Sequence, residues 1–200
     1  MKFSALFTLF ILSVPFNLLS QEKPDALKRG ESASVSENLL KIETFYPSIL
    51  GVSYEKKVSQ DIALYSMLGF FGYGGGGTFS QAIYGANPFY VLLPQLTLQP
   101  RFYHNLSKRA AEDKNTNYNS ANYVGLTVRV YHESYFISNA ERFPKGPATL
   151  DLLLSYGMQR NFFKRMNFDL SLQPGIKFTP EGSGLYVAIN LQLGFIVFSN

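Results

Sequence analysis

The chain has 200 residues, of which 46% are hydrophobic, 16% aromatic and only 16% charged, with a formal net charge of +4. Its lysines and arginines are scattered along the chain, which argues against a nucleic-acid surface. The absence of cysteine excludes disulfides, thiolate metal sites, a cysteine nucleophile and a lipid-modified N-terminal cysteine. An apolar chain of this length, without a long apolar run after its first twenty residues, is typical of one domain built from strands.

The first twenty residues have the composition of an export signal. A short positive segment ends at Lys2, an apolar stretch follows over 3–14, and Ser20 before Gln21 offers a cleavage site. An uncleaved membrane anchor is the alternative, but the apolar stretch is short for a span and Pro15 interrupts it. We therefore expect a cleaved signal peptide.

The segment after the signal is polar, charged and without periodicity, which predicts a flexible periplasmic leader. The expected organisation is a signal peptide at 1–20, a leader at 21–36 and one domain at 37–200.

A two-residue alternation of apolar and polar side chains predicts eight strands in the rest of the chain. Their expected ranges are 37–46, 49–58, 62–74, 89–104, 120–136, 148–162, 166–179 and 185–198. The glycine-rich segment 72–88 lacks the Lys and Ser/Thr of a phosphate-binding loop, so we expect a mobile loop there. Residues 105–119 are the most polar segment of the mature chain and are expected in water, and 138–147 is expected to be a further loop.

The two faces of most strands differ clearly. In the sixth strand Leu150, Leu152 and Leu154 alternate with Asp151 and Ser155. The faces of the third strand stay open, because its large apolar side chains have both parities.

The polar faces consist mostly of Asn, Gln, Ser, Thr and Gly, whereas a strand surface in water usually carries Lys and Glu. Such faces suit the inside of a membrane barrel with an apolar outside. We predict an all-β fold, an eight-stranded antiparallel transmembrane up-and-down β-barrel following the N-terminal signal peptide. The even strand number puts both ends in the periplasm and the loops at 72–88 and 138–147 outside the cell. A secreted soluble lipocalin-like barrel, with apolar side chains inside, is the alternative.

The pattern resembles the small outer-membrane β-barrel proteins of Gram-negative bacteria, over about residues 37–200. The strand patterns at 123–131 and 186–198 carry the likeness, and the segments RFYHNLSKR (101–109) and NSANY (119–123) are similar to uncharacterised barrels of this type. The resemblance implies location in the outer membrane and contact with outer-membrane lipids and the barrel-assembly machinery. Such families usually end in a strand that closes on an aromatic residue. Here that aromatic is Phe198, one place out of register with Phe195 and Val197.

Alternation also places ten charged side chains inside the barrel, five of each sign. They are Lys41, Glu43, Glu55, Lys57, Arg101, Arg129, Glu133, Asp151, Asp169 and Lys177. An eight-stranded barrel is only wide enough for its side chains to fill, so these charges should pair and plug the lumen. Hairpin register predicts Lys41 near Glu55, and Asp151 opposite or diagonal to Lys177.

His104 and His132 are the only histidines, and no close spacing of His, Asp and Glu supports a metal site, so we expect no metal and no cofactor. His132 and Ser134 resemble the His-x-Ser pair of outer-membrane lipid A deacylases, which implies His132 as base, Ser134 as nucleophile and Glu141 as orienting acid. The flanking residues differ from the longer motif of that family. The main expectation is therefore a non-enzymatic outer-membrane barrel with a structural, adhesive or ligand-contact role through its outer loops and an unknown extracellular ligand, with the deacylase-like hydrolase as the alternative.

Overall fold

The computed structural model describes residues 33–132, 137–141 and 146–200, and these form an all-β fold with short helical segments. The strands are β1 (Asn38–Tyr46), β2 (Ser48–Lys57), β3 (Ile62–Gly75), β4 (Phe89–Phe102), β5 (Asn122–His132), β6 (Ile137–Ser138), β7 (Ala148–Phe162), β8 (Met166–Thr179) and β9 (Gly182–Ser199). The helical segments are α2 (Thr78–Tyr84), α3 (Leu106–Ala111) and the 3-10 turn η2 (Asn117–Asn119). Within the described residues, no helix is long and apolar enough to cross a membrane.

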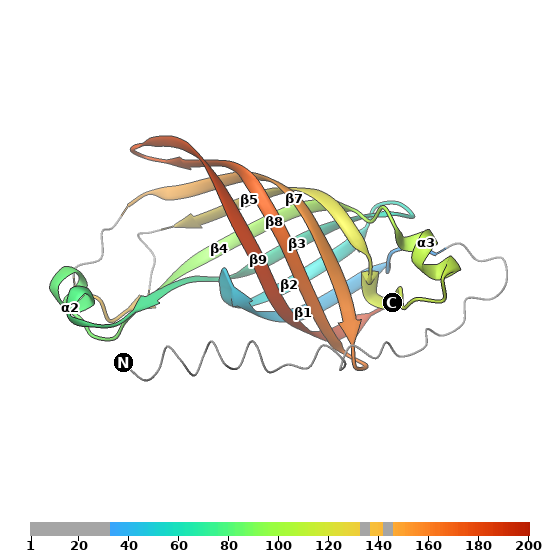
Figure 1. Ribbon diagram of the computed structural model, residues 1–200, viewed down its shortest axis with the longest axis horizontal. Coiled ribbons are helices and arrows are strands. Elements are labelled where there is room, and N and C mark those ends of the chain that lie inside the picture. Colours follow the sequence, from blue (N-terminus) through green and yellow to red (C-terminus); the bar gives the residue numbers. More distant parts are fainter. Residues whose placement is uncertain (1–32, 133–136, 142–145) are drawn as a thin grey trace.

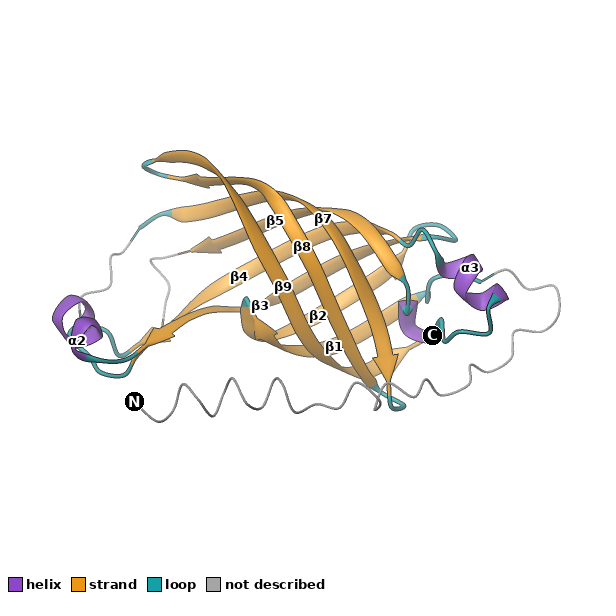
Figure 2. Cartoon of the chain, viewed as in Figure 1, coloured by secondary structure: helices purple, strands orange, loops and turns teal. Residues whose placement is uncertain are grey.

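All described strands belong to one antiparallel sheet, and its eight long strands form a closed ring. Each long strand pairs with the next long strand along the chain. The two-residue β6 pairs with β4 only. The ring closes because β1 pairs with β9, from Leu39 opposite Ser199 to Tyr46 opposite Leu191. Figure 1 shows α3 and the C-terminus at one end of this ring and α2 beyond the other, and Figure 2 shows how the strands make up nearly all of the fold. We refer to these as the α3 end and the α2 end.

The side-chain faces follow the alternation that the sequence predicts. In β7, Leu152 and Leu154 are 40% and 64% exposed on the outside of the ring, whereas Asp151 and Ser155 are buried inside it. The structure also decides the faces of β3, where Tyr65 and Met67 point inward and Leu68 points outward. Mostly amide, hydroxyl and charged side chains therefore fill the ring, with a smaller buried apolar cluster at Phe71, Val91, Leu93 and Tyr131, and aliphatic and aromatic side chains cover the outside.

A β-bulge explains the position of Phe198. The β1–β9 register passes from Leu40 opposite Phe198 to Lys41 opposite Ile196, so one extra residue is inserted in β9. Ile196 is buried, while Phe195 and Phe198 are 51% and 52% exposed. The bulge thus returns Phe198 to the outer face.

The connections between the long strands contain short elements that the sequence analysis does not predict. The glycine-rich segment contains helix α2, and the polar segment 105–119 contains α3 and η2. The expected fifth strand ends at His132 where it is described, and β6 lies at the start of the expected loop 138–147. Propensity gave no helix signal at Thr78–Tyr84, because the surrounding glycines dominate it. The helix forms against the β3–β4 hairpin, where Tyr84 stacks on Phe89 at 4.2 Å between ring centroids.

The α3 end is closed by a small apolar cluster. Leu106 of α3 packs with Tyr103 and Tyr123, and with Ala33 and Val35 from before β1. Residues 33–36 belong to the expected leader, yet the backbone N–H of Val35 donates to the carbonyl of Gln60, and both Ala33 and Val35 are buried. The end of the leader is therefore part of the folded domain.

Candidate functional site

Five charged side chains meet inside the ring, toward its α3 end. They are Lys41, Glu43, Glu55, Arg101 and Asp169, which we call the ionic cluster, and each is at most 1% exposed. The Lys41 ammonium lies 2.9 Å from Glu43 and 2.7 Å from Glu55, as hairpin register predicts for the second pair. Arg101 binds Asp169 at 2.7 Å and lies 3.6 Å from Glu55. Four strands separated by up to 128 positions in the chain thus contribute to one ionic network.

Arg101 occupies the centre of this network. Its guanidinium carbon lies 3.9 Å from the centre of the Tyr65 ring and 4.4 Å from that of Tyr123, so aromatic faces cover the cation. Its N–H groups donate to Gln99 at 2.6 Å and to Gln159 at 2.8 Å, in addition to Asp169. A planar guanidinium with five donors suits such a crowded position better than an ammonium would.

Three tyrosine hydroxyls donate hydrogen bonds to the carboxylates of the ionic cluster. The cluster has three carboxylates against two cations, a net charge of −1 when all are ionised. Tyr65 donates to Glu43 at 2.6 Å, Tyr103 to Glu55 at 2.7 Å and Tyr123 to Asp169 at 2.8 Å. Each carboxylate therefore accepts a hydrogen bond from a neutral donor as well as facing a cation, which lowers the cost of burying it.

The sequence analysis missed these tyrosines, although a signal was present for two of them. Tyr103 and Tyr123 have the same parity as Arg101 and Thr127 on their strands, which places them inside. Tyr65 lies on the strand whose faces the pattern left open, so only the structure identifies its role.

A second set of polar side chains lies toward the α2 end. Arg129 is 3.5 Å from Asp151 and donates to Gln173 at 2.8 Å. Asp151 also accepts a hydrogen bond from Tyr186 at 2.6 Å. Lys177 is the strand partner of Asp151, as predicted, and its ammonium lies 4.7 Å from the centre of the Tyr186 ring. This set carries a net charge of +1, opposite in sign to the ionic cluster.

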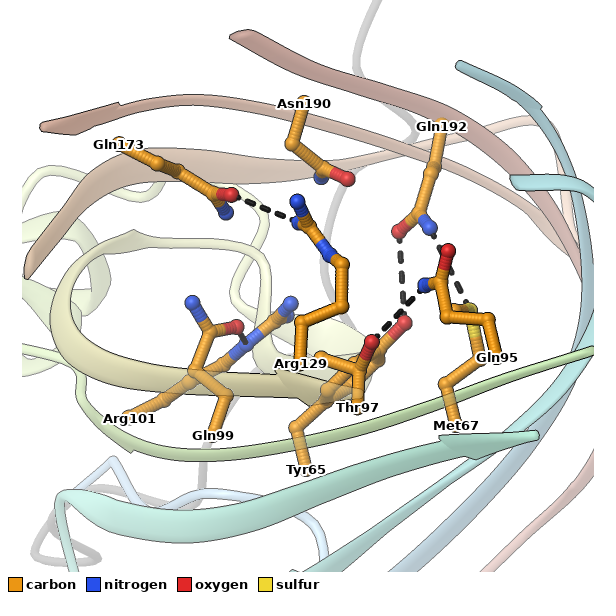
Figure 3. Close-up of a pocket in the computed structure, with 10 residues that line it drawn as sticks. All are labelled: Tyr65, Met67, Gln95, Thr97, Gln99, Arg101, Arg129, Gln173, Asn190 and Gln192. Atoms are coloured by element: carbon orange, nitrogen blue, oxygen red, sulfur yellow. Dashed lines mark hydrogen bonds between the residues drawn. The ribbon is translucent and has the colours of Figure 1, made fainter. Parts of the chain in front are cut away.

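A small cavity lies between the two sets (Figure 3). The centre of a water molecule can move within about 10 Å³ of this cavity, so the cavity holds about one water. Its walls are Tyr65, Met67, Gln95, Thr97, Gln99, Arg101, Arg129, Gln173, Asn190 and Gln192. Arg129 Nε and Gln95 Oε1 are both buried without a hydrogen-bond partner, so a single water that accepts from one and donates to the other fits the chemistry of this space. The interior is thus filled by side chains, with no space for a larger solute in this cavity.

Two of the ten predicted interior charges do not join these networks in the described structure. Lys57 pairs with Glu37 at 2.8 Å, and their side chains are 27% and 57% exposed at the α3 end. The assignment of Lys57 to the filled interior is therefore wrong, because β2 ends there and its long side chain reaches water. The same ammonium lowers the pKa of Glu37 through a hydrogen bond and its charge. Glu133 lies outside the described residues.

The residues of the hydrolase hypothesis are only partly described. His132 is the last residue of β5, opposite Ala148 of β7. The carboxylate of Glu141 lies against Gly85, since a Cβ atom at Gly85 would be 2.8 Å from it. Ser134 lies outside the described residues, as do Ser20 and Gln21 of the expected cleavage site, so these assignments stay predictions. Among the residues in view, no three His, Asp or Glu side chains are grouped as a metal site.

Comparison of the chain with protein-family models, with curated proteins and with solved structures finds no match.

Proposed function

We propose that the protein is an integral outer-membrane β-barrel with a plugged lumen, whose extracellular loops carry a structural, adhesive or ligand-contact role. One observation carries the proposal, namely the inverted burial of the strand ring. Lys41, Glu55, Arg101 and Asp169 are buried inside, while aliphatic side chains such as Leu68 and Leu154 are more than 60% exposed outside. Hydrocarbon is the solvent that such an outer surface fits, and strands in hydrocarbon must close into a ring to pair every backbone group.

The same burial favours a membrane barrel over the soluble lipocalin-like alternative. A lipocalin-like barrel packs apolar side chains inside to hold an apolar ligand and exposes polar ones to water. Here the arrangement is reversed. In the proposed orientation the α3 end and the C-terminus face the periplasm, and α2 and the β8–β9 turn face outward.

Fractionation tests the membrane assignment. We expect the mature protein to pellet with the outer membrane after cell breakage and to stay there after washing with high salt or carbonate, because the apolar outer surface holds it in lipid. A peripheral protein of similar charge serves as the washing control. A mature protein that stays in the soluble fraction would rule out the proposal.

A planar-bilayer recording tests the plugged lumen. We expect the refolded protein to give no steady ionic conductance, because two oppositely charged layers of paired side chains fill the ring and leave room for about one water between them. A general porin inserted under the same conditions is the positive control. Stable, reproducible conductance steps that scale with the amount of protein would contradict the plug.

The deacylase-like alternative has a direct test in Ser134→Ala. We expect mass spectrometry to show the same lipid A acylation pattern for wild type and variant expressed in the same deletion strain, since the residues that flank His132 and Ser134 differ from the longer motif of the deacylases. A pattern that changes when the wild type is expressed, and reverts with Ser134→Ala, would establish the enzyme instead.

A further inference from the structure

The β3–β4 hairpin continues beyond the strand ring as a two-stranded arm. Pairing of β2 with β3 ends at Phe71, and pairing of β5 with β4 ends at Gln95, whereas β3 and β4 pair as far as Gly75 opposite Phe89. Figure 1 shows this hairpin projecting past the neighbouring strands and carrying α2 at its tip. We call residues 72–92 the arm. Apart from β6, which pairs with Val91 and Leu92, no described strand flanks it.

The arm, the rest of β3 and β4 as far as Pro100 have no charged side chain. Asp61 and Arg101 bracket 39 consecutive residues, 62–100, without Asp, Glu, Lys, Arg or His. Two of the other connections at the same end differ, since the 133–147 segment contains two acidic and two basic residues and the β8–β9 turn contains Glu181, whereas the β1–β2 turn is also uncharged. A projecting hairpin in water normally carries charged side chains. They keep the hairpin soluble and prevent its edges from pairing with strands of other molecules.

Helix α2 has two large exposed apolar side chains beside the face that packs on the arm. Its inner face consists of Ser80, which is 7% exposed, and Tyr84, which stacks on Phe89. Phe79 and Ile83 lie four positions apart, so they share a neighbouring face of the helix, where they are 75% and 42% exposed. Tyr90 on the arm adds a third exposed apolar side chain.

The base of the arm lies at the level of an apolar turn. A Cβ atom at Gly72 would be 1.9 Å from the side chain of Ile49, so the arm begins beside the β1–β2 turn. That turn exposes Tyr46, Ile49 and Leu50 by 53%, 46% and 55%. The four residues from Gly72 to Gly75 extend about 13 Å, and at a barrel-strand tilt of about 40° they rise only about 10 Å above this level. The apolar β1–β2 turn thus adjoins the base of the arm.

We propose that the arm is a lipid anchor, in which Phe79 and Ile83 of α2 insert into the outer leaflet beside the barrel. This inference rests on the proposed membrane location of the ring. Lipid is favoured over a second copy of the chain because α2 has only seven residues and two exposed apolar side chains, far less than the roughly 800 Å² that each partner of a stable dimer buries. An interfacial helix, by contrast, gains from each apolar side chain that it inserts.

The absence of tryptophan from the chain makes the test specific. Phe79→Trp places a single reporter on α2, Leu154→Trp places one in the middle of the outer surface of β7, and Lys108→Trp places one on α3, where the side chain is 76% exposed. Each variant is refolded into phospholipid vesicles with ordinary or brominated acyl chains, and far-UV circular dichroism checks that it folds. Ile83→Trp is the second reporter on α2, in case Phe79→Trp does not fold.

We expect brominated lipid to quench Phe79→Trp and Leu154→Trp and to leave Lys108→Trp unchanged, with the emission of the first two shifted to the blue. Acrylamide should quench only Lys108→Trp. If Leu154→Trp is quenched by brominated lipid but both α2 reporters respond to acrylamide alone, the arm lies in water and the anchor is wrong while the barrel proposal stands. If α2 emission depends on protein density and ignores brominated lipid, a second copy covers the arm and the anchor is wrong. If Leu154→Trp itself is not quenched, the membrane proposal fails and the anchor with it.

Discussion

Replacing Lys41 with alanine should lower the free energy of unfolding by about 3–5 kcal/mol, because the change leaves two buried carboxylates without their main cation. Lys41 is fully buried and lies within 2.9 Å of both Glu43 and Glu55. Its loss changes the net charge of the ionic cluster from −1 to −2 at a position that is fully buried. Urea titration of the refolded protein, followed by tyrosine fluorescence and circular dichroism, measures the effect.

Two variants serve as controls for this prediction. Lys57→Ala removes the same side chain from a pair at the exposed end of β2 and should have a much smaller effect, since exposed ion pairs contribute little. Asp151→Ala should fall between them, because its pair with Arg129 is longer, at 3.5 Å, and lies near the α2 end. If Lys57→Ala destabilises as much as Lys41→Ala, burial of the ionic cluster does not control stability.

Replacing Arg101 with methionine should have an effect at least as large as that of Lys41→Ala. Methionine keeps much of the volume between Tyr65 and Tyr123 but removes the donors to Asp169, Gln99 and Gln159. The main cost is the buried Asp169 carboxylate, left with Tyr123 as its short donor at 2.8 Å. The same urea titration measures it.

The double variant Arg101→Met with Asp169→Asn separates charge from packing. Asparagine removes the uncompensated charge and keeps a group that accepts a hydrogen bond from Tyr123. We therefore expect the double variant to recover a substantial part of the stability lost in Arg101→Met, as apolar or neutral replacement of buried ion pairs often does. Additive losses in the double variant would indicate that the cost of Arg101→Met comes from lost packing against the tyrosines instead.

Much of the fold follows from local alternation. Leu152 and Leu154 face outward and Asp151 and Ser155 inward because successive side chains of a strand point to opposite faces, so parity alone assigns them. Register within a hairpin also depends mainly on local chain length. This is why the approach of Lys41 to Glu55, and of Asp151 to Lys177, is predictable from the sequence.

Other features depend on contacts that no local pattern records. The faces of β3 are ambiguous in the sequence because both are apolar, and neighbouring strands on each side decide that Tyr65 points to Glu43. Helix α2 forms where glycines predict a loop, since its stability comes from packing on the hairpin. Asn119 of η2 donates to Glu55 at 2.7 Å, and this contact exists only because the polar segment folds back over the α3 end.

The sequence by itself determined the strand character of the chain, the even number of long strands, the two faces of most of them and eight of the ten charges assigned to the inside. The strand character, the faces and the inside charges are properties of single strands and hairpins. The tertiary structure alone decided that β1 closes on β9 through a bulge that turns Phe198 outward, and that Arg101 lies between two tyrosine rings. It also decided that the arm projects beyond the ring. The physical reason is that closing the ring joins strands from opposite ends of the chain, and the fit of their side chains in a shared, filled interior fixes positions that alternation leaves open.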